Sequence, residues 1–273
     1  MEKTNKKINI TAIQMESSIG DKYGNFEKIL DLAEQNIKKD TDVLILPELW
    51  AIGWACDEFV KNAEDKKNNE TVEFLSELAQ KYQTNILGGS YIRKENNKLF
   101  NTCPIISRKG ELIAEYDKNH LFSYYDDCEN KYITQGKNPV IVDIEGIKFG
   151  ISVCYDIRFP EIYRAYRKSG ADVLVNMAAW PLSRKIHWDS LTQARAVENQ
   201  TYMIALTQTG TLPTGAKNLG HSLIYDYSGN IIDEIDTKEG SITAELNFDE
   251  MYDFRNKCTI LKDIHDNYEV ILK

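Results

Sequence analysis

The chain has 273 residues, of which 42% are hydrophobic and 27% are charged. This composition can supply a buried core without disulfides or metals, which excludes a small cross-linked scaffold. The 42 acidic and 33 basic side chains give a net charge of −9, which argues against a nucleic-acid partner. No apolar run approaches the about 18 residues that a membrane-spanning helix needs, so no membrane partner is expected.

The five cysteines are an odd number and lie far apart: Cys56, Cys103, Cys128, Cys154 and Cys258. Neither Cys-x-x-Cys nor His-Glu-x-x-His occurs, which argues against a structural zinc site. The odd count favours free thiols in a reducing compartment. The segment 8–14 alternates apolar and polar residues, whereas a signal peptide needs a continuous apolar stretch, so we expect a cytoplasmic protein.

The first half of the chain interleaves strand and helix patterns. Alternation over 8–15 predicts a strand, and apolar residues at helical spacing predict a helix over 24–38. The uninterrupted apolar run at 43–46 is typical of a strand that is covered on both faces. Helical spacing from Val72 to Tyr82 predicts a second helix, and strand-like segments follow at 85–93, 99–107 and 111–116.

The second half of the chain continues this interleaving. In chain order we expect a hairpin, a helix, a strand, a helix, a strand and a second hairpin, at 140–144 with 148–153, 160–168, 172–176, 184–199, 202–207, and 222–227 with 231–235. The pattern beyond residue 250 is mixed. No linker or repeat divides the chain, so the sequence predicts a single domain over 1–273 of the layered α/β or α+β class.

Cys154 follows a strand pattern with apolar residues at alternate positions, namely Ile147, Phe149, Ile151 and Val153. It stands at the end of this strand, on the less apolar face, where the chain turns toward Tyr155. Open α/β sheets usually place their functional sites at such strand ends. An isolated cysteine is more often a buried structural thiol, so its position alone does not identify a nucleophile.

Two charged residues also follow predicted strands. Glu48 stands directly after the apolar run, next to Trp50, where partial desolvation would raise the pKa of its carboxyl toward the range of a general base. Lys118 follows the strand at 111–116, and a cation near a thiol lowers the pKa of the thiol and can stabilise an oxyanion. Taken singly, each residue is more often an exposed surface charge.

Three motifs, which occur in a fixed order, favour a functional interpretation of these three residues over a structural one. They are Leu-Pro-Glu at 46–48, Lys-x-His-Leu-Phe at 118–122 and Val-Cys-Tyr-Asp-x-Arg-Phe-Pro-Glu at 153–161. Further matching segments are Trp-Pro at 180–181, Ala-Arg-Ala-Val-Glu-Asn-Gln at 194–200 and Gly-His-Ser at 220–222. Together these motifs resemble the nitrilase, or carbon–nitrogen hydrolase, superfamily over about residues 8–250.

The resemblance implies a four-layer αββα sandwich that pairs with a second copy, as a homodimer or a larger homo-oligomer. It also implies a Glu–Lys–Cys triad that hydrolyses a non-peptide carbon–nitrogen bond with water and needs no cofactor or metal. Carried onto this chain, the triad is Glu48, Lys118 and Cys154. The family's second carboxylate corresponds to Glu129, and the backbone N–H of Tyr155 corresponds to an oxyanion donor.

Within the superfamily the chain looks most like the ω-amidase branch, whose substrates are small-molecule amides of short dicarboxylic and 2-oxo acids. Such a substrate needs a cationic anchor, for which Arg184 is the candidate because a guanidinium binds a carboxylate bidentately. Trp180 and Trp50 are the candidate pocket walls. An arginine in a surface ion pair and two core tryptophans are the structural alternatives.

Other functions stay open at this point. The same fold serves aliphatic amidases, N-carbamoyl amide hydrolases and amidases that act on deaminated glutathione. A non-catalytic binding or scaffold protein could retain the fold as well. A Cys–His hydrolase with His120, His187 or His221 as the base is a further alternative, although the papain-type Cys-Gly-Ser-Cys-Trp context is absent.

Overall fold

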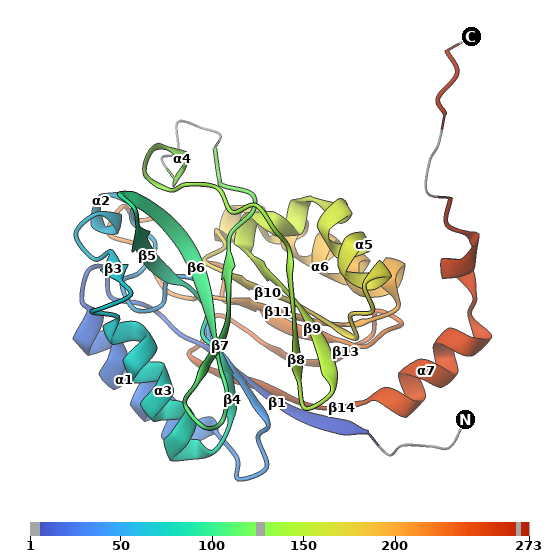
Figure 1. Cartoon of the computed structure of the whole chain (residues 1–273), viewed down its shortest axis with the longest axis horizontal. Helices are drawn as coiled ribbons and strands as arrows, with labels where there is room; N and C mark the ends of the chain where they lie inside the picture. The colour runs from blue at the N-terminus through green and yellow to red at the C-terminus, as the bar shows by residue number, and fades with distance from the viewer. Residues whose placement is uncertain (1–5, 124–128, 266–268, 273) are drawn as a thin grey trace.

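The computed structural model describes residues 6–123, 129–265 and 269–272. Within these residues two β-sheets face each other, and helices cover the outer face of each sheet (Figure 1). The chain therefore forms four layers in the order helix, sheet, sheet, helix, which confirms the expected αββα sandwich.

The first sheet has eight strands in the order β14-β1-β2-β4-β6-β5-β3, with β7 paired to β6. Their bounds are β1 (Lys7–Gln14), β2 (Val43–Ile45), β3 (Glu64–Asp65), β4 (Asn85–Leu87), β5 (Tyr91–Glu95), β6 (Lys98–Ile106), β7 (Leu112–Asp117) and β14 (Gly240–Asn247). The strands β1, β2 and β4 run parallel, so their carboxyl ends meet at one edge of the sheet.

The second sheet has six strands in the order β13-β12-β11-β10-β9-β8. Their bounds are β8 (Val140–Ile144), β9 (Ile147–Val153), β10 (Val173–Ala178), β11 (Tyr202–Thr207), β12 (Ser222–Tyr225) and β13 (Ile231–Ile235). The central strands β9, β10 and β11 are parallel, with Val153 opposite Met177 and Ala178 opposite Thr207. The residues that follow these three strands are therefore brought together.

Helices α1 (Lys22–Asn36) and α3 (Glu70–Tyr82) cover the first sheet, whereas α5 (Pro160–Lys168) and α6 (Lys185–Asn199) cover the second (Figure 1). Both α1 and α3 begin with a side-chain cap, since Asp21 and Asn69 accept hydrogen bonds from backbone N–H groups of the first turn. The remaining helices are α2 (Cys56–Phe59), α4 (Glu129–Tyr132), α7 (Phe248–Lys257) and the 3₁₀ turns η1 (Cys154–Arg158), η2 (Leu182–Arg184) and η3 (Ile260–Asp263).

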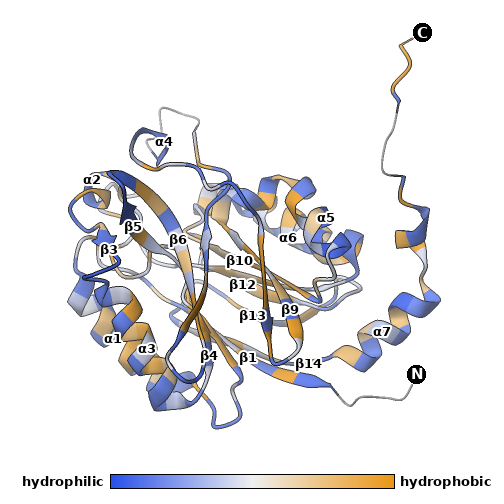
Figure 2. Ribbon diagram, viewed as in Figure 1, coloured by the Kyte–Doolittle hydropathy of each residue, from blue (hydrophilic) through white to orange (hydrophobic). Residues whose placement is uncertain are grey.

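The strand β2 is buried on both faces, as its sequence predicts. Val43 and Ile45 belong to the core between the two sheets, whereas Leu44 and Leu46 pack into the core under α1 and α3. Apolar residues accordingly dominate the central strands, and the helices carry polar residues on their outer sides (Figure 2). Because both faces of β2 are covered, the position of its end is fixed, and so is the position of Glu48, which follows Pro47.

The structure corrects two expectations about secondary structure. The segment 85–93, expected as one strand, is two strands separated by Gly88-Gly89-Ser90. Gly89 has a φ of +65°, and a Cβ at this position would lie 2.0 Å from the carbonyl oxygen of Pro47, so the chain bends where only glycine fits. The strand β14 was not predicted, and the segment with a mixed pattern beyond residue 250 contains most of the helix α7 and the 3₁₀ turn η3.

One cysteine differs from the expectation of free thiols. Cys56 is disulfide-bonded, whereas Cys103, Cys154 and Cys258 carry free thiols. Cys128 lies outside the described residues. In the part of the chain that the structure describes, no helix combines the length and the apolar character that crossing a membrane would require.

Candidate functional site

Glu48 follows β2 and its side chain is fully buried between the two sheets, deeper than the strand-rim position expected from the sequence. Its Oε2 accepts a hydrogen bond from the backbone N–H of Ala179 at 2.9 Å. Gln208 donates to the backbone carbonyl of Glu48 at 2.6 Å. Ala179 and Gln208 follow the parallel strands β10 and β11 of the second sheet. Residues at the edge of the second sheet therefore hold Glu48, which follows a strand of the first sheet.

Lys118 follows β7 and is also buried. Its ammonium donates to Glu48 Oε1 at 2.9 Å and contacts both carboxylate oxygens of Glu129 at 2.9 Å. Burial alone would lower the pKa of Lys118, but the charges of Glu129 and Glu48 outweigh it and hold this pKa well above its ordinary value. The lysine is therefore a fixed cation between two carboxylates.

Glu129 begins the short helix α4 and is fully buried. Besides its contacts with Lys118, its Oε2 accepts a hydrogen bond from the backbone N–H of Phe122 at 2.7 Å. Burial raises the pKa of Glu129, the charge of Lys118 opposes this rise, and the charge of Glu48 adds to it. The structure thus brings together the two glutamates and the lysine selected from the sequence.

Cys154 stands directly after β9 as the first residue of η1, in a left-handed backbone conformation with a φ of +48°. Its carbonyl oxygen lies 3.4 Å from the side-chain amide of Asn176. Burial and the nearby charge of Glu48 raise the pKa of the Cys154 thiol well above its ordinary value, although Lys118 acts in the opposite direction. The expected lowering by Lys118 is therefore outweighed, and the resting side chain is a neutral thiol.

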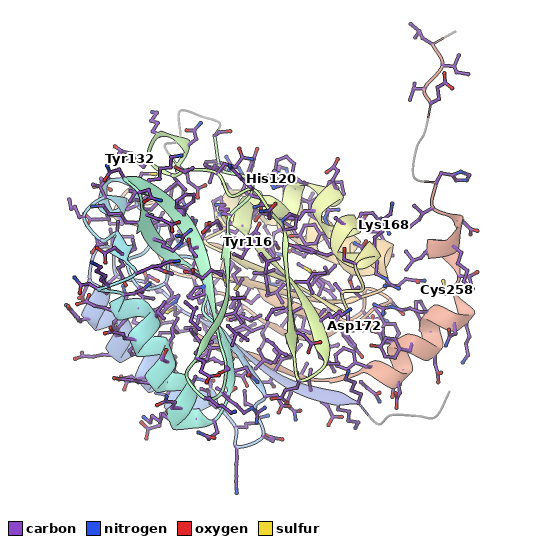
Figure 3. The ribbon with its side chains drawn as sticks, in the orientation of Figure 1. Tyr116, His120, Tyr132, Lys168, Asp172 and Cys258 are labelled. Carbon is purple, nitrogen blue, oxygen red and sulfur yellow. The ribbon has the colours of Figure 1, made fainter. Side chains whose placement is uncertain are left out.

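A buried network joins the turn that carries Cys154 to the loop that carries Lys118. The carboxylate of Asp156 accepts hydrogen bonds from the Tyr116 hydroxyl at 2.6 Å and from the backbone N–H groups of Val153 and His120 at 2.9 Å. The ring of His120 lies 2.7 Å from the same carboxylate, and Tyr116 and His120 lie near each other at the end of β7 (Figure 3). The sequence motifs contain both Asp156 and His120 but do not indicate this connection.

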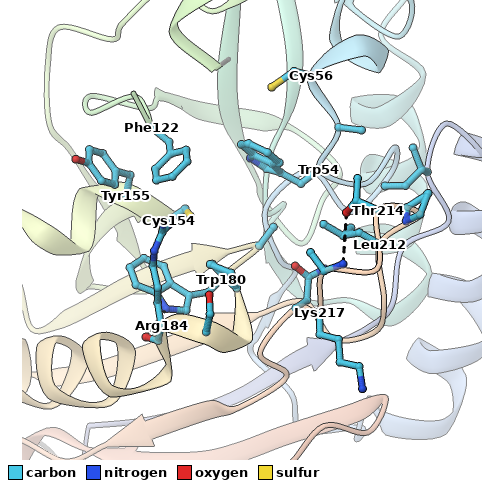
Figure 4. A pocket seen from close by; sticks show the side chains of 18 of the residues that line it. Trp54, Cys56, Phe122, Cys154, Tyr155, Trp180, Arg184, Leu212, Thr214 and Lys217 are labelled. Carbon is cyan, nitrogen blue, oxygen red and sulfur yellow. Dashed lines mark hydrogen bonds between the residues drawn. The ribbon is translucent and has the colours of Figure 1, made fainter. Parts of the chain in front are cut away.

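A cavity of about 690 Å³ opens above Cys154 and Lys118. Aromatic side chains form much of its wall, namely Trp54, Phe122, Tyr132, Tyr155 and Trp180. Figure 4 shows Phe122, Tyr155 and Trp180 around Cys154, with Trp54 and the segment from Leu212 to Lys217 on the opposite side. Such a cavity can bind a small organic molecule next to the thiol.

The positively charged side chains in the cavity wall include Arg158 and Arg184. The guanidinium of Arg158 lies over the Trp180 ring at 4.8 Å from its centroid, and that of Arg184 lies over the Phe122 ring at 5.1 Å. Trp180 donates its indole N–H to the carbonyl oxygen of Arg184 at 2.9 Å. Arg184 was selected from the sequence, whereas Arg158 was not, although it stands inside the third motif.

Trp50 does not line this cavity, which corrects the expectation that it walls the substrate site. Its ring is fully buried in the core under α1 and α3, against Phe26 and Phe74. Its indole N–H donates to the carbonyl oxygen of Gly88 at 2.9 Å. Trp54, four residues later, lies in the cavity wall instead, because the chain turns back after Pro47 and brings only the later tryptophan to the opening.

The histidines considered as alternative bases contact residues other than Cys154. His187 lies 3.2 Å from Arg158, and His221 lies 3.5 Å from Asp189. None of the cavity-lining residues in the described ranges is a histidine. The titratable groups with the largest effects on the pKa of the Cys154 thiol are Glu48, Lys118 and Glu129, which favours a carboxylate over an imidazole as the partner of the thiol.

Comparison with known proteins gives a consistent family assignment. Residues 9–256 match the model of the carbon–nitrogen hydrolase family. The chain is 36% identical to a 2-oxoglutaramate amidase of Bacillus subtilis over 258 residues, which are 94% of this chain and 98% of the relative. It is 30% identical to an omega-amidase of Saccharomyces cerevisiae over 94% of this chain and 93% of the relative.

Solved structures show the same architecture. The crystal structure of Saccharomyces cerevisiae Nit3, a member of branch 10 of the nitrilase superfamily, superposes with a TM-score of 0.83 at 30% identity, covering 92% of this chain and 94% of that one. A protein of the CN-hydrolase superfamily from Xanthomonas campestris, solved with an arsenic adduct in its active site, gives a TM-score of 0.88 at 26% identity. That superposition covers 97% of this chain and 99% of the other.

Proposed function

Because the chain belongs to the carbon–nitrogen hydrolase family, we propose that it is an amidase whose nucleophile is Cys154, whose general base is Glu48 and whose oxyanion partner is Lys118. The observation that carries this proposal is the buried cluster in which one ammonium contacts two carboxylates beside a thiol at the floor of a cavity. Such a cluster of ionisable groups is costly to bury, and perturbed groups of this kind concentrate at active sites.

The first half of the reaction follows from the resting state of the thiol. The raised pKa of Cys154 means that a base must take its proton, and the carboxylate of Glu48 is within hydrogen-bonding reach. The resulting thiolate attacks the amide carbon, and the C=O electron pair moves onto oxygen. The ammonium of Lys118 and the backbone N–H of Tyr155 stabilise this oxyanion, and one such donor is typically worth about 3–4 kcal/mol.

The second half returns the enzyme to its starting state. The tetrahedral intermediate collapses, the C–N bond breaks, and Glu48 gives the proton it has taken to the departing nitrogen, which leaves as ammonia. A water molecule then attacks the thioester carbon, with Glu48 accepting its proton. The second tetrahedral intermediate collapses, the C–S bond breaks, and Glu48 returns the proton to the Cys154 sulfur as the carboxylic acid is released. Glu129 contacts Lys118 through both oxygens throughout, which keeps the ammonium aimed at the reacting carbonyl.

The wall of the cavity supports an anionic amide as the substrate. The guanidinium of Arg158 lies over Trp180 and that of Arg184 over Phe122, in the wall of the cavity that Cys154 also lines. A guanidinium binds a carboxylate through two parallel hydrogen bonds. Relatives named 2-oxoglutaramate amidase and omega-amidase match nearly the whole chain. We therefore assign the short dicarboxylic and 2-oxo acid monoamides as the substrate class, with the distal carboxylate at Arg184 and the amide at Cys154.

A substrate panel tests this function. Ammonia release is measured for 2-oxoglutaramate, succinamate, glutamine, a neutral aliphatic amide, an N-carbamoyl amide and a simple nitrile. The highest kcat/KM is expected for 2-oxoglutaramate or succinamate. Preference for the neutral amide, the N-carbamoyl amide or the nitrile would contradict the substrate class but not the family. Release from none of them, together with a Cys154 that resists iodoacetamide, would support a non-catalytic scaffold.

The anchor role of Arg184 predicts a selective loss of affinity. Replacing Arg184 by alanine is expected to raise KM for 2-oxoglutaramate by about 10- to 100-fold, because a charge-assisted hydrogen bond to the substrate carboxylate is lost. KM for the neutral amide should change little. Steady-state kinetics on both substrates check this, with Arg164→Ala on α5 as the control outside the cavity. An equal rise in KM for both amides would remove the anchor role.

We also propose that the protein pairs with a second copy of itself. The apolar side chains of Ile186 and Val197 on α6 are 72% and 45% exposed, and Val270 and Leu272 near the C-terminus are 92% and 99% exposed. Pairing with a second copy would remove such side chains from water. Light scattering is expected to give about twice the 31.4 kDa mass of one chain, whereas a monomer at micromolar concentration would contradict the pairing.

A further inference from the structure

Asn101 is a buried residue of β6 that touches both carboxylates of the site and does not line the cavity. Its side-chain amide donates to Glu48 Oε1 at 3.0 Å and to Glu129 Oε1 at 3.1 Å. We propose that Asn101 is a positioning residue that keeps Glu48 and Glu129 ionised and side by side. Glu48 can then still accept the Cys154 proton at lower pH. This inference rests on the triad of the proposed function and adds a residue outside it.

The backbone of Asn101 fixes the same site. Its carbonyl oxygen accepts the backbone N–H of Lys118 at 2.8 Å. Asn101 therefore holds the lysine through its main chain and the two glutamates through its side chain. The ammonium of Lys118 donates to the same two Oε1 atoms, so each of these oxygens accepts one bond from Lys118 and one from Asn101.

The orientation of the amide supports this role. The side-chain oxygen of Asn101 is buried and has no hydrogen-bond partner among the described residues. A buried acceptor without a partner costs free energy. Rotating the amide would place this oxygen against Glu48 and Glu129, where it would face two acceptors. The unpaired oxygen is thus the consequence of directing both N–H groups at the carboxylates.

The charges around Asn101 explain why two further N–H groups are needed. The ionisable residues that it contacts are Glu48 after β2, Lys118 after β7 and Glu129 on α4. All three also act on the Cys154 thiol after β9. One ammonium cannot fully neutralise two carboxylates, and two like charges at close range favour protonation of one of them. An N–H donor stabilises a carboxylate without adding charge. Asparagine therefore stabilises both anions, whereas an aspartate or a leucine at this position would not.

The predicted consequence is a change in pH dependence. In Asn101→Leu both carboxylates lose a donor, so each holds a proton more readily and the acid limb of kcat/KM moves to higher pH. Losing a hydrogen bond to a charged group should move this limb by about one pH unit and reduce kcat near the wild-type acid limb by about 10-fold. KM should stay near the wild-type value because Asn101 does not reach the cavity.

The experiment measures the alkylation rate of Cys154 by iodoacetamide against pH, with the modified residue identified by mass spectrometry. It reads the thiol directly, so it remains valid even if the assigned amides prove not to be substrates. Wild type is compared with Asn101→Leu, with the near-isosteric Asn101→Asp and with Asn85→Leu. Asn85 is a buried asparagine that donates to Asp42 and Glu145 and lies outside the site, so Asn85→Leu controls for the loss of a buried amide.

Both Asn101 variants are expected to show the acid-side rise of the alkylation rate at higher pH than wild type, and Asn85→Leu is expected to match wild type. Asn101→Asp retains the shape of the side chain, so it carries the test if Asn101→Leu fails to fold. An acid-side rise at the wild-type pH in the folded Asn101 variants would overturn the proposal, even if their activity fell. An equal shift of the acid-side rise in Asn85→Leu would also overturn the proposal, since the loss of any buried amide would then have the same effect.

Discussion

Replacing Cys154 by alanine is expected to lower kcat for amide hydrolysis by at least about 10⁴-fold. Removal of a nucleophile that acts together with its base costs about this much or more, because no thioester can form. The protein should remain folded, since the change deletes one sulfur from a side chain that borders an open cavity and creates no enclosed void.

Ammonia release at saturating amide and the midpoint of thermal unfolding check this expectation. The control is Cys258→Ala, which also removes a free thiol but lies beside α7, away from the cavity (Figure 3). It should retain wild-type activity. Undiminished hydrolysis by Cys154→Ala would refute the nucleophile assignment, and an unfolded variant would be replaced by Cys154→Ser.

Replacing Glu48 by glutamine is the second change with a large expected effect. Glutamine keeps the shape of the side chain but cannot accept the Cys154 proton or return it to the leaving nitrogen. General acid–base catalysis typically contributes 10²–10⁴-fold, so kcat should fall by about 10³-fold. The alkylation rate of Cys154 at neutral pH should fall as well. The substitution removes the carboxylate charge that helps to raise the pKa of the thiol, but burial still raises this pKa and no carboxylate remains at position 48 to take the proton.

Steady-state kinetics and iodoacetamide labelling measure these losses together. Glu64→Gln is a matched control, because Glu64 is also buried but bonds to Thr71 and Lys22, away from the cavity. It is expected to keep the wild-type kcat. Wild-type turnover in Glu48→Gln combined with inactive His120, His187 or His221 variants would instead support a histidine base.

The elements that could be predicted from the sequence are those in which the pattern of apolar residues directly reflects which faces are buried. The run at β2 is apolar throughout because both of its faces are covered, and β11 and α5 have the bounds that their patterns predict. The break after β4 could not be read, because nothing local shows that Gly89 must avoid the carbonyl oxygen of Pro47. The helix α7 was not predicted, although Phe248, Met251 and Tyr252 recur at helical spacing.

The same division applies to the site. Glu48, Lys118 and Cys154 could be selected because each stands in a motif and follows a strand. Asn101 and Arg158 gave no separate signal, since asparagine in a strand and arginine in a turn have many structural uses. Trp50 and Trp54 are four residues apart with similar surroundings in the sequence. Only the path of the chain after Pro47 decides which of them reaches the cavity.

By itself, the sequence determined the strand-and-helix pattern, the family and the side chains that carry the chemistry, because these depend on local periodicity and on motifs. The tertiary structure alone decided the protonation states and the contacts between distant residues. Folding brings the ammonium of Lys118 to 2.9 Å from Glu48, which lies 70 residues earlier in the chain. The nearby carboxylates hold the pKa of Lys118 above its ordinary value, and burial together with the charge of Glu48 raises the pKa of the Cys154 thiol. Such pKa shifts arise only when ionisable groups are both buried and close to one another, and neither condition can be predicted from the order of residues.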